Sequence, residues 1–388
     1  MTTHSRHTFL DLFRGLFVLL MVEGHCVRVV LDQGSRSSFA FDLHEILHGI
    51  TAPGFLFTSG FALAIASHRK RDELQSLSPA LGQRLWRGLA LILLGYALHL
   101  PYWSITKTLT ASSAEEWRSF TAFGVLQLIG TVIIVIRLLF LAIRSNRLFL
   151  LVVSAFFILV VYLTPLMWDP HVTSTLPDIL AAALNSASGS PFPIFPFAAF
   201  FIAGIIVSWL FLDQTNSRGE RSFMVWLAVA GVICVACGLG SSMLPIEPLG
   251  ETDFWYTSPS YVWIRLGVLL FLMSLFWFIE DRLRRAPRLL RFRPQWIATL
   301  GRESYFVYVV HLFVIFGWLL NPFLNIEEVA SAQLAWLPAL CAAVVIIGVL
   351  ALLASTWHLL KKEHPVVVQG LLTWFWFTTV YYSLINPF

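Results

Sequence analysis

Long apolar stretches separated by short polar segments run along the whole chain. A helix needs about 20 mostly apolar residues to cross a lipid bilayer, and eleven stretches come near this length. No internal repeat and no soluble domain lies between them. The pattern predicts an all-α fold, a polytopic membrane helix bundle of about 11 transmembrane helices, which forms one integral membrane domain over residues 1–388. The predicted spans are 9–31, 45–66, 84–103, 120–141, 148–165, 192–212, 222–244, 261–280, 304–320, 333–357 and 366–385.

The composition excludes a water-soluble protein. Residues of the set AVILMFWYC make up 57% of the chain and charged residues 12%, whereas a soluble domain carries roughly a quarter charged residues. The 33 Phe and 15 Trp residues are too many for soluble cores of this size. Four cysteines form no disulfide framework, and the net charge of +4 is spread over many short loops, so it does not indicate nucleic acid as a partner.

Lysine and arginine residues alternate between the two sides of the predicted bundle. If the N-terminus lies in the cytoplasm, 19 of the 26 fall in cytoplasmic segments and three in outer loops, while four lie within or at the ends of spans. Short cytoplasmic loops of membrane proteins are enriched in positive charge. The split therefore predicts a cytoplasmic N-terminus and an outer C-terminus. No small-residue cleavage site follows the first span, so we expect a retained helix rather than a signal peptide.

The first span contains ionisable residues on one face. Arg14 and His25 are eleven residues apart, which is about 20° past three helical turns and about 16 Å along the axis. An arginine inside a span costs about 3 kcal/mol, so we expect an anionic group to meet Arg14, unless its side chain snorkels to the lipid headgroups. His25 cannot snorkel inward, and the shared face therefore favours a protein interior or a water-filled cavity.

Three segments resemble signatures of the transmembrane acyltransferases. In acyltransferase type 3 proteins the first span has a basic residue, ten intervening residues and a histidine, and Arg14 and His25 match that spacing in LDLFRGLFVLLMVEGH. Residues 48–66 are similar to the family's second span. The superfamily also includes proteins that resemble heparan-alpha-glucosaminide N-acetyltransferase. A count of eleven spans favours these N-acetyltransferase-like proteins. They commonly have Asn at the position of His25, however, so the subfamily is left open.

The third similar segment is LGRESYFVYVVHLFVIFG, residues 300–317, which contains Tyr305, Tyr308 and His311. The resemblance implies a membrane-embedded enzyme that transfers an acyl group, usually acetyl from cytoplasmic acetyl-CoA, to a sugar hydroxyl or amine on the outer side. We expect a multi-pass protein of a bacterial inner membrane that modifies carbohydrate. The expected partners are membrane lipid and a sugar or glycan acceptor, with no nucleic acid, and a homodimer is left open.

Basic residues near the cytoplasmic face are candidates for binding the CoA phosphates, because Arg and Lys are the usual partners of phosphate. Arg14 is the first candidate. The loop that contains Arg69, Lys70 and Arg71 is the second, although the preference for positive charge on the cytoplasmic side explains that loop equally well.

Several histidines are predicted to lie at the outer side, where an acyl acceptor would need a general base. His25 lies in the outer half of the first span, and His44 and His48 stand on one helix face at the start of the second. The catalytic candidates are His25, His48 and His311. Residues proposed to line the acceptor pocket are His44, Tyr305 and Trp255; an interfacial aromatic belt is the alternative for Trp255.

Two other functions are consistent with parts of the sequence. Residues 44–48 match H-E-x-x-H, the zinc motif of metalloproteases, but that chemistry needs a third protein ligand and no further metal-ligand run is visible. We therefore expect no metal. Ionisable residues inside spans also suit a secondary transporter, although no pair of Gly- or Pro-broken segments recurs in two halves of the chain.

Overall fold

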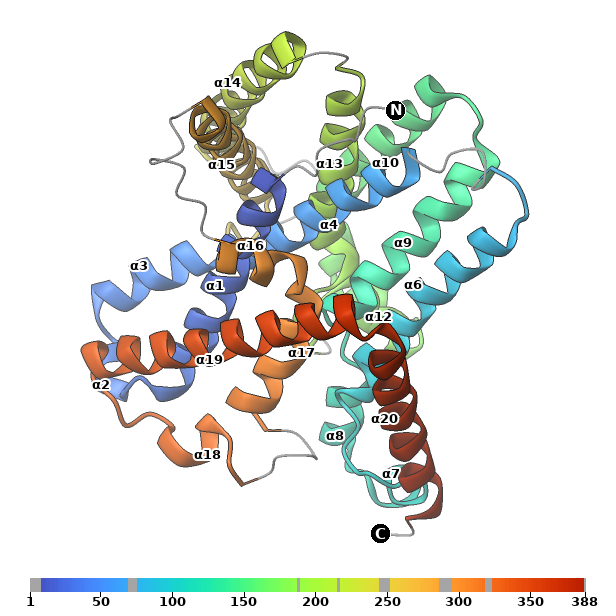
Figure 1. Cartoon of the computed structure of the whole chain (residues 1–388), viewed down its shortest axis with the longest axis vertical. Helices are drawn as coiled ribbons and strands as arrows, with labels where there is room; N and C mark the ends of the chain where they lie inside the picture. Colours follow the sequence, from blue (N-terminus) through green and yellow to red (C-terminus); the bar gives the residue numbers. More distant parts are fainter. Residues whose placement is uncertain are drawn as a thin grey trace. The chain divides into compact units, whose positions relative to one another are not determined.

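The computed structural model describes residues 8–68, 75–186, 189–214, 217–243, 252–285, 295–317 and 323–386. All regular structure in these ranges is helical, and the only pairing of β type is an isolated bridge between Leu31 and Leu334. The predicted all-α fold is therefore confirmed (Figure 1). The helices are α1 (Thr8–Val30), α2 (Gln33–Arg36), α3 (Phe39–His48), α4 (Thr51–His68), α6 (Pro79–Ala97), α7 (Ile105–Ala111), α8 (Ala114–Thr121), α9 (Val125–Ala142), α10 (Asn146–Trp168), α11 (Pro170–Thr173), α12 (Asp178–Leu184), α13 (Ile194–Leu212), α14 (Ser217–Ser242), α15 (Pro259–Arg285), α16 (Gln295–Arg302), α17 (Ser304–Ile315), α18 (Ile326–Ala330), α19 (Trp336–Glu363) and α20 (Pro365–Ile385).

Seven helical segments within the described ranges are long and apolar enough to cross a membrane: α9, α10, α13, α14, α15, α19 and the consecutive pair α3–α4. The chain is thus a multi-pass membrane protein. The other four predicted spans differ from these in composition or length. Helix α1 carries four charged residues and α6 carries two arginines, while α17 has only 12 residues and α20 is rich in aromatic and hydroxyl side chains. The count of eleven and the cytoplasmic N-terminus stay predictions.

The chain divides into two compact units, which are described separately; the single domain expected from the sequence stays a prediction. Unit 1 comprises residues 1–52, 102–111 and 276–388. Helix α1 is its central element and contacts α3, α16, α17, α18 and α19. Phe9, Phe13 and Phe17 on α1 are fully buried, so this helix has the surroundings of a core helix rather than of one that faces lipid.

Two glycines bring α16 against the backbone of α1. A Cβ atom at Gly301 would overlap the carbonyl oxygen of Asp11, and one at Gly15 would overlap the carbonyl oxygen of Ile297. Small residues allow membrane helices to approach this closely. The close contact fixes α16, and through it the start of α17, relative to α1.

The C-terminal end of α1 is held by backbone hydrogen bonds to the segment before α19. The amide of Asp32 donates to the carbonyl of Leu334 at 2.9 Å, and the amide of Leu334 donates to the carbonyl of Val30 at 2.8 Å. Arg36 donates to the carbonyls of Arg28 and Leu31 at 2.6 and 2.9 Å. These bonds satisfy carbonyls that a helix end leaves without intrahelical partners.

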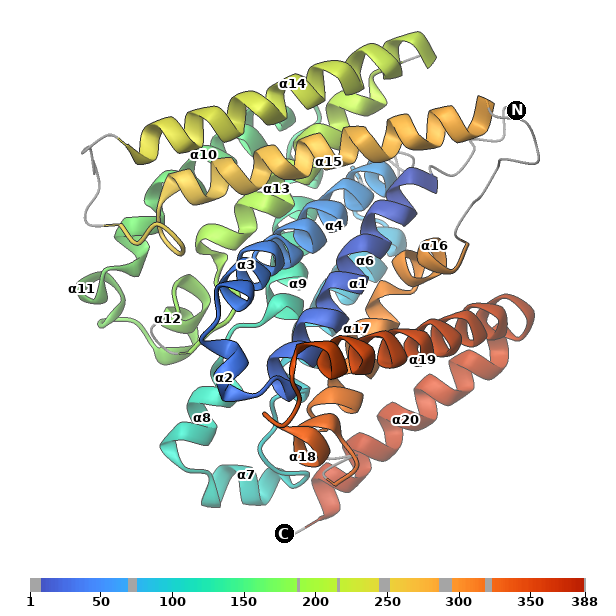
Figure 2. The same ribbon diagram turned by 90° about the vertical axis from the view of Figure 1, so that its left-hand side faces the viewer.

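Unit 2 comprises residues 53–101 and 112–275 and is built from closely packed helix pairs. Gly88 of α6 faces Gly130 of α9, and Gly231 of α14 faces Gly267 of α15; Figure 2 shows α14 and α15 running side by side. Gly60 of α4 and Gly204 of α13 make similar contacts, and α10 packs along α13. The same small-residue packing therefore recurs throughout unit 2.

We expect Gly301→Val to destabilise unit 1, because its side chain would meet the Asp11 backbone, which cannot rotate away. The expected loss is about 1–3 kcal/mol, as for other overpacked sites, measured as a lower midpoint of thermal unfolding in detergent. Gly348→Ala on α19 is the matched control, because open space surrounds that glycine. An unchanged midpoint for Gly301→Val would contradict the close contact of α16 and α1.

Candidate functional site

His25 and His311 lie together in unit 1. The ring centroids are 5.3 Å apart and the ring planes are inclined by 63°. His25 comes from α1 and is half-buried, whereas His311 comes from α17 and is fully buried. The ring of Phe316 packs edge-on against His25 at 5.4 Å. Two residues predicted independently as catalytic candidates are therefore neighbours.

The hydrogen bonds of His311 leave one ring nitrogen available. Its Nδ1 is 3.1 Å from the carbonyl oxygen of Val307. A carbonyl can only accept, so Nδ1 carries the proton and Nε2 has a free lone pair. Nε2 is buried without a hydrogen-bond partner. The His25 ring has no hydrogen-bond partner within the described residues either. The pair can consequently exchange a proton with a bound molecule.

Arg14 lies on the same face of α1 as His25, about 16 Å towards the N-terminal end, and its side chain is half-buried. Charged groups from other helices surround this end of α1. The backbone amide of Phe9 donates to the Glu280 carboxylate, and Arg302 pairs with Asp11 at 3.0 Å. The face of α1 that carries Arg14 and His25 therefore has charged groups near its N-terminal end and the two imidazoles further along.

Glu303 is a buried carboxylate that the sequence analysis did not select. It accepts hydrogen bonds from His358 Nδ1 at 2.8 Å and from Lys361 Nζ at 2.7 Å. The bonds attach the start of α17 to α19, so they position the helix that carries His311. One signal was present, because Glu303 is the only acidic residue between positions 295 and 317.

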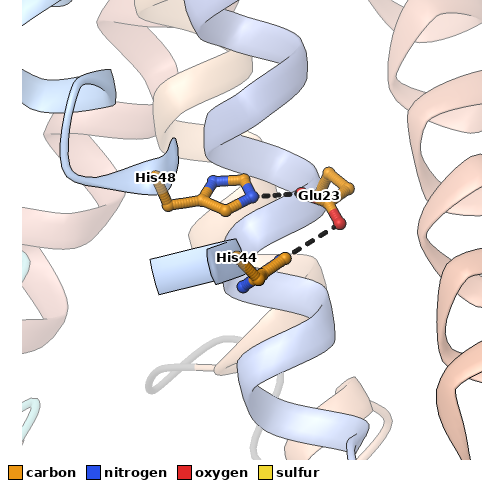
Figure 3. Close-up of side chains that lie close together, drawn as sticks. All are labelled: Glu23, His44 and His48. Atoms are coloured by element: carbon orange, nitrogen blue, oxygen red, sulfur yellow. Dashed lines mark hydrogen bonds and ion pairs between the residues drawn. The ribbon is translucent and has the colours of Figure 1, made fainter. Parts of the chain in front are cut away.

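A second polar cluster joins α1 to α3 (Figure 3). The Glu23 carboxylate contacts His44 Nε2 at 3.2 Å and His48 Nε2 at 2.5 Å. The two imidazole rings are 4.0 Å apart, so the expectation that they share one helix face is confirmed. Glu23 was missed, although it is the only acidic residue in the second half of the first predicted span.

The glutamate of the H-E-x-x-H segment, Glu45, pairs with a residue outside the segment. Arg28 donates to both carboxylate oxygens of Glu45, at 2.7 and 2.8 Å. A metalloprotease needs that carboxylate free to activate water. Glu23 supplies the third ligand position that the sequence did not reveal, but the paired Glu45 argues against proteolysis.

Two further predicted residues, Tyr305 and Trp255, belong to different units. Tyr305 is 49% exposed on α17. Trp255 belongs to unit 2, where Arg265 lies 5.5 Å from its ring centroid. His99, also in unit 2, follows α6 and hydrogen-bonds through Nδ1 to the carbonyl of Gly95 in that helix. Arg69, Lys70 and Arg71 lie outside the described residues.

Unit 2 contains a buried arginine that belongs to the 19 charges counted as cytoplasmic, although its position, 137, lies within the predicted span 120–141. Arg137 lies within α9, is 2% exposed and donates to Ser67 Oγ at 2.6 Å. Its Nε is buried without a partner, and no carboxylate pairs with it in the part of the chain that the structure describes. Arg137 is thus packed inside unit 2 and not exposed at the end of the helix.

Comparison with protein families identifies the chain. The family model described as an acyltransferase domain, that of the acyltransferase type 3 family, matches residues 7–356. The chain belongs to this family, which confirms the resemblance seen in the three segments. Arg14, His25 and His311 all lie within the match, and α20 lies beyond it. No curated protein matches the chain. It is thus a membrane acyltransferase by family, rather than a transporter or a metalloprotease.

We expect Glu303→Gln to lower the free energy of unfolding by about 1.5–3 kcal/mol, because hydrogen bonds to a charged group are lost and Lys361 is left without its carboxylate. Thermal unfolding in detergent measures the change. Glu363→Gln is the matched control, since Glu363 is exposed on the same helix as Lys361. Equal midpoints for the two variants would refute the role of Glu303 in attaching α17 to α19.

Proposed function

We propose that this protein transfers an acetyl group from cytoplasmic acetyl-CoA to a hydroxyl or amine of a sugar or glycan on the outer side of a bacterial inner membrane. The observation that carries the proposal is the His25–His311 pair, with ring nitrogens available, in a chain of the acyltransferase type 3 family. The Arg14–His25 spacing supports the direction from cytoplasm to outer side.

His25 acts as the general base. One of its ring nitrogens takes the proton from the acceptor hydroxyl or amine, and the acceptor atom attacks the thioester carbonyl carbon. The carbon–sulfur bond then breaks, and the CoA thiolate leaves and takes up a proton. A neutral imidazole is suited to this task. His311, with its Nδ1 held by a carbonyl, positions the His25 ring and limits the orientations it can adopt.

Arg14 holds the phosphates of the donor. Arginine pairs well with phosphate, and an anion there offsets the cost of a cation inside a spanning helix. The extended pantetheine arm of CoA is long enough to cover the roughly 16 Å that separates Arg14 from His25 along α1. The thioester would then reach the imidazole. The transfer itself needs no metal in this scheme.

Replacing His25 with Ala should leave the protein folded and able to bind acetyl-CoA, but transfer should fall by about 100- to 10,000-fold, as for loss of a general base. Transfer of radiolabelled acetyl groups to a glycan acceptor measures this. His99→Ala is the matched control, because that ring hydrogen-bonds to the carbonyl of Gly95, four residues earlier in the chain. Near-normal transfer by His25→Ala would move the reaction centre elsewhere.

Replacing Arg14 with Ala should weaken acetyl-CoA binding by about tenfold or more, the value of one charge-assisted hydrogen bond, while Arg14→Lys should retain part of the affinity. Isothermal titration calorimetry in detergent measures both. Arg87→Ala provides the control, since Arg87 is exposed on α6. If Arg14→Ala binds acetyl-CoA as the wild type does, snorkelling to the headgroups explains Arg14 instead.

A further inference from the structure

We propose that Glu23, His44 and His48 bind a divalent cation of the zinc class that holds α3 against α1. Two imidazoles and one carboxylate form the donor set of many zinc sites. The ligand atoms of the three residues all lie within 4.8 Å of one another. This inference concerns a different face of α1 from the reaction centre, and it does not depend on the proposed acyl transfer.

The geometry of the cluster suits one ion. With metal–ligand bonds of about 2.0–2.2 Å, neighbouring ligand atoms of a tetrahedral site lie about 3.3–3.5 Å apart. The separation of His44 Nε2 and Glu23 Oε1 is already 3.2 Å. The shorter contact of His48 to Glu23, at 2.5 Å, has to lengthen by a side-chain rotation. Three protein ligands leave a fourth position for water.

Hydrogen bonds alone do not satisfy every ring nitrogen of the cluster. To donate to Glu23, the Nε2 atom of His44 must carry its proton, and a neutral ring then has a bare lone pair on Nδ1. That Nδ1 is buried without a hydrogen-bond partner, and an oxygen of Glu45 lies 3.5 Å from it. In that tautomer two acceptors face one another.

A cation on Nε2 reverses this arrangement. The proton of His44 then resides on Nδ1 and is directed to the Glu45 carboxylate, which is the usual way in which a carboxylate orients a metal-binding histidine. Glu45 is itself fixed by the two hydrogen bonds from Arg28. The Arg28–Glu45 pair thus has the position of an outer support for the site.

The charge and packing of α1 fit the same reading. Glu23 pairs with no Lys or Arg among the residues that the structure describes, so a cation would neutralise a carboxylate that otherwise meets only imidazoles. Gly24 lies beneath the His48 ring, and a Cβ atom there would be 2.5 Å from His48 Nδ1. The His44 and His48 side chains are 9% and 6% exposed, but that of Glu23 is 20% exposed, which leaves an approach for an ion.

The cation site is separate from the base proposed for acyl transfer. Glu23 and His25 are two residues apart, which places them about 200° apart around the helix. Because Arg28 donates to both oxygens of Glu45, that carboxylate is not free to activate water. The cation therefore has a structural role, in fixing α3.

The test is metal binding by the full-length protein purified in detergent without chelator and without a polyhistidine tag. We expect about one zinc per chain by mass spectrometry. After chelation, calorimetric titration with Zn²⁺ should show one site, which Glu23→Gln and His48→Asn weaken by more than about 100-fold, beyond the usual effect of an outer-shell change. Glu45→Gln should weaken it by about tenfold. His171→Asn, at an exposed position of unit 2, should not change it.

Stability provides a second readout that is independent of catalysis. Zn²⁺ should raise the thermal midpoint of the wild type but not that of Glu23→Gln, because a ligand that binds only the folded state stabilises it. If a variant does not fold, Co²⁺ added to the chelated wild type decides, since ligation by two imidazoles and a carboxylate gives visible absorption bands. Absence of those bands, or wild-type Zn²⁺ affinity in Glu23→Gln, would overturn the site.

Discussion

The polar side chains of α1 are the constraint on which unit 1 depends. A helix that lies at membrane depth and is buried by its neighbours must find a partner for each charged group, because an unpaired charge there costs several kcal/mol. Three of these groups, Asp11, Glu23 and Arg28, are met by side chains of α16 and α3. The partners are Arg302 of α16 for Asp11, His44 and His48 of α3 for Glu23, and Glu45 of α3 for Arg28.

The glycine contacts make these pairings possible. Gly301 allows the last turn of α16 to lie directly on the Asp11 backbone, which brings Arg302 to the Asp11 carboxylate. Glu303, the next residue, then turns to α19. One close backbone contact thereby sets the starting position of α17 and, through it, the depth at which His311 meets His25.

Helix α1 has two polar faces with different chemistry. On one face, His25 lies beside His311 of α17. No described side chain hydrogen-bonds to their free ring nitrogens, which suits a group that exchanges a proton in each reaction. On the other, Glu23 and the two histidines of α3 contact one another closely, which suits a fixed structural link. The proposed reactive and structural roles are thus separated by the helical repeat alone, although Glu23 and His25 are neighbours in sequence.

The sequence by itself determined the all-α class and the membrane environment, because apolar length and composition are properties of each segment. It also indicated the family, through the resemblance of three short segments. It also placed Arg14 with His25, and His44 with His48, since the helical repeat fixes residues that are eleven or four positions apart. Only the tertiary structure decided that His311 joins His25, that Glu23 joins the α3 histidines, and that Arg137 is buried. Those contacts join segments far apart in the chain, and side-chain packing between helices, which no local pattern encodes, selects them.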